Sequence, residues 1–159
     1  MTVITHLKTL YEIDSNQWLE ETIELLKANR FNELDLENLI EELEALGRSD
    51  KNAVESLLEQ VIRHLLLLQY WSEESEYNKS HWQAEITGFR TQLKRRLTSS
   101  LRNHLLKELS SLYQDALAYV RQKTSLEVDF PTECPYPLEE LLNINWFPSR
   151  LSEIPLNPP

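Results

Sequence analysis

The sequence predicts an all-α fold: an up-and-down antiparallel bundle of four to five helices with an extended C-terminal strap. The 159-residue chain contains two Gly, and all seven Pro lie from Pro131 onward, so the first 130 residues carry few residues that interrupt helices. Before that point, apolar residues recur at intervals of three and four, the period of a helix with one buried face. Its length, with 41% hydrophobic and 26% charged residues, suits one core.

We expect a single domain over residues 1–159. The bundle is predicted at about residues 15–123, and an extended strap with a short helix at residues 124–148. Residues 149–159, which are rich in Pro, are expected to form a mobile tail. The architecture therefore places all packed helices before the proline-bearing segment.

The first predicted helix is capped by Asp14 or Ser15 and runs to about Arg30. Asp35 is predicted to cap the next helix, which should bury one stripe consisting of Leu36, Leu39, Ile40, Leu43 and Leu46. Gly47 has two interpretations. It either ends this helix in the left-handed conformation or lies within one long, bent helix.

The next helical segment, from about Asp50 to Trp71, becomes apolar on nearly all sides in its second half and should form the centre of the core. A polar loop is expected at residues 72–79, and Ser80 with Gln83 fits a capping box that starts another helix. Thr98 and the two serines after it predict a break and a cap before the last long helix. Short connections favour antiparallel neighbours.

The composition changes past Thr124. The segment LEVDFPTECPYP is expected to run extended, with Phe130 and Tyr136 docked on the bundle. A short helix is predicted to start at Pro137, because proline suits the first position of a helix. The strap should therefore be held by its aromatic side chains.

The formal net charge of −10 is unevenly distributed. Residues 1–80 carry −10, residues 81–123 carry +5 and residues 124–159 carry −5. A predicted interaction patch supplies most of the positive charge: Lys94, Arg95, Arg96, Arg102 and Lys107. This patch either complements acidic helices of its own chain or of a second subunit, or binds nucleic acid. The acidic remainder of the chain disfavours nucleic acid.

The N-terminal sequence lacks the pattern of a secretory signal, and the longest aliphatic run, Leu65 to Leu68, is too short to cross a bilayer. Cys134 is the only cysteine, so no intramolecular disulfide can form. These features predict a cytoplasmic protein without a membrane partner.

Three histidines, His64, His81 and His104, fall on successive predicted helices, as in some metal-binding bundles. Helix geometry places His81 roughly 10 Å below His64 in an antiparallel pair. It also turns His104 away from its apolar stripe. We therefore expect His64 to be a hydrogen-bonded core residue, with a metal or catalytic site of His64 and Glu85 as the alternative.

Glu42 lies at the edge of its leucine stripe, and Arg90 lies beside the apolar face of a later helix. A partly buried carboxylate needs a partner, so we predict a Glu42–Arg90 ion pair. Together with His64 and Glu85, these residues form the one speculative catalytic cluster in the sequence. No cofactor is expected, because no nucleotide-binding or nucleophile motif occurs.

Six blocks in the same order carry a resemblance to a known family: YEIDSNQWLEE, LDLENLIEELEALGRSD, LLEQVIRHLLLLQYW, SHWQAEITGFR, SSLRNHL and FPTECPYPLEELL. They resemble the small bacterial proteins, abundant in cyanobacteria, known as domain of unknown function family 29. The resemblance spans roughly residues 10–148. It implies an α-helical fold and brings no activity or site residues.

For function, the leading hypothesis is a non-catalytic protein–protein interaction module, with a protein partner or a homo-oligomer. Its basis is the charge segregation together with Tyr11 and Trp146 as candidate exposed aromatics. The alternative is an enzyme using carboxylate, histidine or metal in the bundle core. A weaker alternative is nucleic-acid binding through the basic hairpin.

Overall fold

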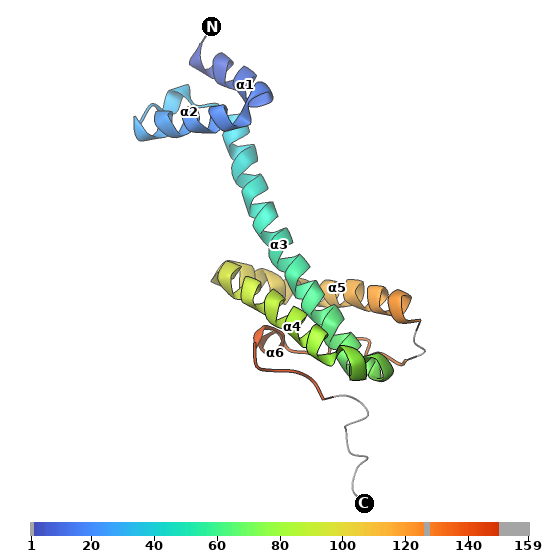
Figure 1. The fold of residues 1–159 in the computed structure, drawn as a ribbon. Helices are drawn as coiled ribbons and strands as arrows, with labels where there is room; N and C mark the ends of the chain where they lie inside the picture. Colours follow the sequence, from blue (N-terminus) through green and yellow to red (C-terminus); the bar gives the residue numbers. More distant parts are fainter. Residues whose placement is uncertain (1, 126–127, 150–159) are drawn as a thin grey trace, which may run out of the picture. The chain divides into compact units, whose positions relative to one another are not determined.

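The computed structural model describes residues 2–125 and 128–149, which contain helices and no strand (Figure 1). The all-α prediction is therefore confirmed over the described residues. The elements in chain order are α1 (Val3–Ile13), α2 (Ser15–Lys27), the 3-10 helix η1 (Phe31–Glu33), α3 (Leu36–Tyr70), α4 (Ser72–Arg96), α5 (Ser99–Thr124) and α6 (Leu138–Leu142).

Two compact units make up the chain, Met1–Ser49 and Asp50–Pro159. Each has its own cluster of buried hydrophobic side chains, and the division falls within α3. We call them the N-terminal unit and the C-terminal unit. Whether the two fold together as the single domain expected over residues 1–159 stays a prediction.

The N-terminal unit starts with a helix that the sequence did not predict. Thr2 accepts a hydrogen bond from the Thr5 amide at 3.2 Å and caps α1. Asp14 follows α1 and caps α2, since its Oδ1 accepts from the Gln17 amide at 3.1 Å. The predicted cap at Asp14 is confirmed. The two helices are thus joined through a single residue whose side chain begins the second one.

A small core holds this unit together. It consists of Leu7, Trp18, Leu25 and Leu34. The indole Nε1 of Trp18 donates to Oδ2 of the buried Asp35 at 3.3 Å. Asp35 also accepts from the Asn38 side chain and amide, at 2.6 and 3.5 Å, which confirms it as the cap of α3. One carboxylate therefore ties α2 to the start of α3.

Helix α3 runs without interruption for 35 residues, through Gly47. The interpretation of Gly47 as a left-handed cap is wrong, because no described glycine has a positive φ. The alternative of one long helix is correct. Apart from Gly47 itself, its chain neighbours and the backbone of its own helix, no atom lies within 4 Å of the position that a Cβ would take there, so no close approach requires glycine.

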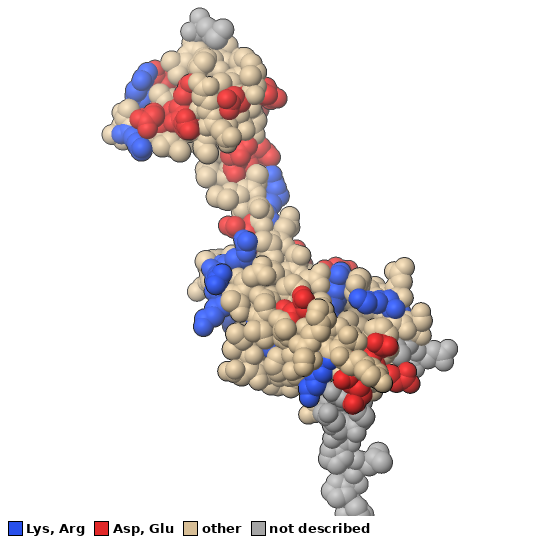
Figure 2. Space-filling model, viewed as in Figure 1, with Lys and Arg blue, Asp and Glu red and all other residues tan. Residues whose placement is uncertain are grey.

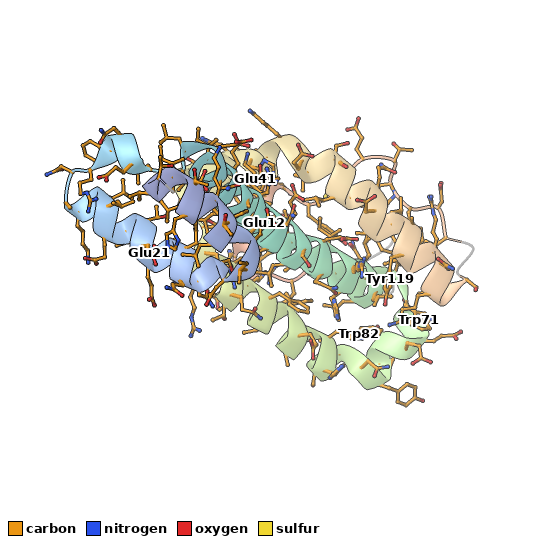
Figure 3. All side chains as sticks on the ribbon, turned by 90° about the horizontal axis from the view of Figure 1, so that it is seen from above. Glu12, Glu21, Glu41, Trp71, Trp82 and Tyr119 are labelled. Carbon is orange, nitrogen blue, oxygen red and sulfur yellow. The ribbon has the colours of Figure 1, made fainter. Side chains whose placement is uncertain are left out.

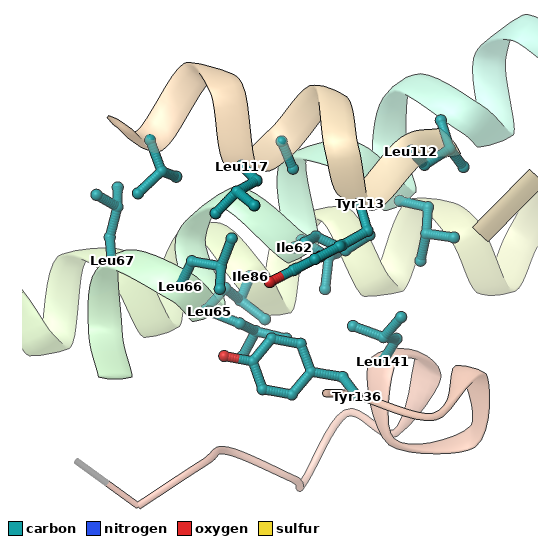
Figure 4. Packing of buried hydrophobic residues seen from close by; sticks show 14 of the residues in the cluster. Ile62, Leu65, Leu66, Leu67, Ile86, Leu112, Tyr113, Leu117, Tyr136 and Leu141 are labelled. Atoms are coloured by element: carbon teal, nitrogen blue, oxygen red, sulfur yellow. The ribbon is translucent and has the colours of Figure 1, made fainter. Parts of the chain in front are cut away.

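The C-terminal unit packs the second part of α3 against α4 and α5 around a core of aliphatic and aromatic side chains (Figure 4). Leu65, Leu66, Leu67 and Leu68 are all buried, as their position in the sequence predicted. Thr98 caps α5 by accepting from the Leu101 amide at 3.2 Å, which confirms the predicted break.

Helix α4 begins at Ser72, and Trp71 alone separates it from the end of α3, so the loop predicted at residues 72–79 is wrong. Ser80 lies inside the helix, and its predicted capping box with Gln83 is wrong as well. Glu73 and Glu74 occupy the first turn, where negative charge stabilises a helix. The polar segment is therefore the largely exposed start of α4, with Ser75 buried.

The strap packs on the C-terminal unit as predicted. Phe130 and Tyr136 are buried, and α6 begins directly after Pro137. The hydroxyl of Tyr113 donates to the Pro131 carbonyl at 2.6 Å, and the hydroxyl of Tyr136 donates to Gln69 Oε1 at 2.6 Å. Of the predicted tail, residues 150–159 lie outside the described residues.

Candidate functional site

The N-terminal part of α3 exposes the apolar stripe that the sequence predicted to be buried. Leu36, Ile40, Leu43 and Leu46 are between 53% and 61% exposed. Leu39 packs against the small core of the N-terminal unit. The buried-stripe prediction is therefore wrong for four of its five residues. We call these four exposed side chains the α3 stripe.

Acidic residues surround the α3 stripe. At about 100° per residue, Glu42 lies on one side of it, while Glu37 and Glu44 lie on the other. The hydroxyl of Tyr11 donates to Glu42 Oε1 at 2.6 Å, and this hydrogen bond raises the pKa of Tyr11 to about 12. This contact joins α1 to α3 and holds Glu42 along the stripe.

The whole N-terminal unit is strongly acidic. It contains four Lys and Arg against eleven Asp and Glu, a formal net charge of −7. Its carboxylates come from every helix, with Glu12 on α1, Glu21 on α2 and Glu41 on α3 (Figure 3). Its four basic residues all pair with carboxylates: Lys8 lies 3.6 Å from Glu37, Arg48 contacts Glu41 at 3.0 Å and Glu44 at 3.9 Å, and Lys27 and Arg30 pair with Glu24 and Glu33. The other carboxylates of the unit outnumber these cations. The surface view shows carboxylates over this unit (Figure 2).

The predicted Glu42–Arg90 ion pair is wrong, because each residue has other partners. Tyr11 is the partner of Glu42. The buried guanidinium of Arg90 donates to three backbone carbonyls, those of Leu141 at 2.8 Å, Trp146 at 2.7 Å and Glu140 at 3.0 Å. Arg90 thereby holds α6 and the chain after it. Desolvation lowers its pKa to about 10.

His64 is a half-buried residue with a local hydrogen bond, the interpretation preferred from the sequence. Its Nδ1 lies 2.7 Å from the Gln60 carbonyl and donates to it, and its ring packs against Phe89 with centroids 5.3 Å apart. Desolvation lowers the pKa of His64, while the charge of Glu85 acts in the opposite direction. Burial therefore favours the neutral imidazole.

His81 and His104, the other two histidines of the predicted metal set, have different surroundings from His64. Nε2 of His104 donates to Glu55 Oε1 at 2.6 Å, whereas His81 is exposed. Within residues 2–125 and 128–149, no group of three His, Cys, Asp or Glu side chains could hold a metal ion. The thiol of Cys134 donates to the Tyr136 carbonyl at 3.4 Å, and burial raises its pKa.

The predicted basic patch lies where α4 ends and α5 begins, and Lys and Arg side chains gather there in the surface view (Figure 2). Its exposed members are Lys94, Arg95, Arg96 and Lys107. Arg102 is half-buried and forms an ion pair with Glu139, which lies in the first turn of α6. The patch is therefore tied to the strap through one of its members.

The aromatic side chains that could have served recognition belong to the two cores. Trp82 is buried and stacks on Trp71, with centroids 6.1 Å apart and ring planes 21° apart (Figure 3). Tyr11 and Trp146, the candidate exposed aromatics, are both half-buried and pack against the two cores, so that expectation is wrong. Aromatic burial thus removes one basis of the interaction hypothesis, and the α3 stripe supplies another.

None of the helices in the described part of the chain has the length and apolar character needed to cross a membrane.

Comparisons with known proteins give one match. A family profile described as Domain of unknown function DUF29 matches residues 10–147. The search of curated proteins and the search of solved structures each returned no match. The profile covers most of the 159 residues and agrees with the resemblance seen in the sequence blocks. The chain therefore belongs to the Domain of unknown function DUF29 family.

Proposed function

We propose that this protein is a non-catalytic protein-interaction module that docks a partner on the α3 stripe. The observation that carries the proposal is the exposure of Leu36, Ile40, Leu43 and Leu46 on consecutive turns of one helix. Single exposed apolar side chains are common on protein surfaces, whereas a contiguous row marks an interaction site.

The spacing of the stripe suits a helical partner. Leu36, Ile40 and Leu43 follow one another at intervals of four and three, the pattern by which two helices pack along a common seam. Full burial of a Leu or Ile side chain contributes about 1.5–3 kcal/mol. Four such residues supply enough apolar surface to drive association.

The charges around the stripe favour a partner helix with Lys or Arg beside its apolar seam. Glu37, Glu42 and Glu44 lie along the stripe, and the unit carries −7. A second copy of this chain would bring its own carboxylates against these, which opposes association. Opposite charges would instead steer the partner and set its register.

A binding assay with two synthetic helical peptides tests the proposal. Both carry the same leucine seam, one flanked by Lys and the other by Glu. We expect the Lys-flanked peptide to bind the full-length chain at least about tenfold more tightly, and its affinity to fall with added salt. The double variant Ile40→Gln/Leu43→Gln should lower that affinity about a hundredfold or more, because two buried anchors are lost.

The matched control is Ile13→Gln, which changes an exposed apolar residue (77% exposed) at the end of α1 and should leave binding unchanged. Equal binding of the two peptides, or unchanged binding by the double variant, would contradict the proposal. Sedimentation of the free chain provides a further test. If the wild-type chain sediments as a dimer and the double variant as a monomer, the stripe binds a second copy of the chain. That result would contradict the proposed partner helix with Lys or Arg beside its seam.

A further inference from the structure

The C-terminal unit contains a cavity whose lining includes no residue of the α3 stripe. It has a volume of about 350 Å³ and lies at the end of α4, where the chain turns into α5 and α6 lies alongside. Its lining consists of Arg90, Lys94, Leu97, Arg102, Leu142 and Ile144. Half of the lining residues are cations and the other half are aliphatic.

The cations are incompletely neutralised. No carboxylate among the described residues lies within 4 Å of the charged groups of Arg90 or Lys94. The bonds of Arg90 go to three neutral carbonyls and use three of its five N–H donors. Burying a cation without a counter-charge is costly, so an anion entering the cavity would be favoured.

Only Arg102 has an acidic partner. Its guanidinium pairs with Glu139, whose side chain is 78% exposed. Exposed ion pairs contribute about 0–1 kcal/mol, so this contact competes weakly with a ligand. Arg102 therefore remains available to a second anion at the rim of the cavity.

The aliphatic lining residues indicate that the ligand also has an apolar part. Leu97, Leu142 and Ile144 form an apolar wall next to the cations. A low-dielectric wall strengthens the attraction between an anion and the cations. Covering the wall with the apolar atoms of a ligand also makes the free energy of binding more favourable. The volume falls at the lower end of the range for small-molecule sites. We propose that this cavity binds a small organic acid, with a carboxylate or phosphate head on Lys94, Arg102 and Arg90 and an aliphatic body on the wall.

This cavity differs from the general basic surface around it. Arg95, Arg96 and Lys107 belong to the same basic patch but do not line the cavity. A nucleic-acid phosphate would use these exposed cations and leave the aliphatic wall uncovered. A small acid depends on the lining cations and on the wall together.

Isothermal titration calorimetry on the full-length chain tests this with three probes that share a six-carbon chain: hexanoate, hexyl phosphate and hexanol. We expect at least one of the two anions to bind saturably and hexanol to bind at least about tenfold more weakly. Whichever anion binds more tightly identifies the head group. Lys94→Gln/Arg102→Gln should weaken anion binding about tenfold or more, since it removes two charged donors while retaining the structural Arg90.

The control variant Arg95→Gln/Lys107→Gln removes the same charge outside the cavity and should leave the affinity nearly unchanged. Its thermal unfolding and that of the cavity variant should match the wild-type protein, because all four side chains lie at the surface or its edge. Three outcomes would overturn the proposal: no saturable binding of either anion, equal binding of hexanol, or equal weakening by the two variants. None of them depends on peptide binding by the α3 stripe.

Discussion

Replacing Arg90 with Met is expected to lower the free energy of unfolding by about 3–5 kcal/mol. The side chain is 2% exposed, and it supplies the donors for the carbonyls of Leu141, Glu140 and Trp146. Met fills much of the same volume but donates no hydrogen bond, so three carbonyls lose their charged partner. Denaturant unfolding of the variant, followed by circular dichroism, measures the loss.

Two further variants separate this role from a general loss of charge. Arg90→Lys should also destabilise strongly, because one ammonium group cannot reproduce the fork of a guanidinium that reaches three carbonyls. Arg96→Gln, on the exposed end of the same helix, should change the free energy of unfolding by less than about 0.5 kcal/mol. Full stability of Arg90→Met would show that the strap is held without this residue.

Replacing Trp18 with Ala should have a comparable effect on the N-terminal unit, about 3–5 kcal/mol. Trp18 is 1% exposed, packs edge-on against Tyr11 at 5.0 Å between centroids, and donates to the buried Asp35. The core of this unit has few other large side chains, so the cavity cannot be filled by neighbours. Limited proteolysis should then cleave within Met1–Ser49.

Trp18→Phe isolates the hydrogen bond. It keeps most of the packing, so its cost should be smaller, about 1–3 kcal/mol for the hydrogen bond that the buried Asp35 carboxylate loses while it keeps its Asn38 donors. Leu19→Ala is the control, since Leu19 is the adjacent residue and is 46% exposed. A wild-type protease pattern for Trp18→Ala would contradict the account of this core.

Local chemistry explains which parts of the fold the sequence predicts. The caps at Asp14, Asp35 and Thr98 each depend on a side-chain oxygen and an amide three residues later, so a short sequence window contains all the information. The run from Leu65 to Leu68 is apolar on all sides and is buried accordingly. Both signals involve only neighbours along the chain.

Two helices escape prediction because their sequences are polar. Helix α1 begins at a Thr2 cap, and α4 begins at Ser72 with two glutamates in its first turn. Glu and Lys are good helix formers, so a polar segment without Gly or Pro can be an exposed helix. The absence of Gly and Pro from these two segments is the available signal for both.

The candidate sites depend on information that periodicity does not contain. The repeat of Leu36, Ile40, Leu43 and Leu46 shows that α3 has an apolar face, but not whether another element covers it. The cores of both units are filled by other residues. The three carbonyl partners of Arg90 lie at least 50 residues away in sequence, beyond any local pattern.

The central claim is that the α3 stripe is exposed in the free chain, and the most direct test is the free energy of unfolding of Ile40→Gln/Leu43→Gln. We predict a value within about 0.5 kcal/mol of the wild-type protein, because both side chains already contact solvent. Leu58→Gln, at a fully buried position of the same helix, should cost more than about 3 kcal/mol under the same conditions. A loss of similar size in the double variant would show that the stripe is buried and would contradict the account.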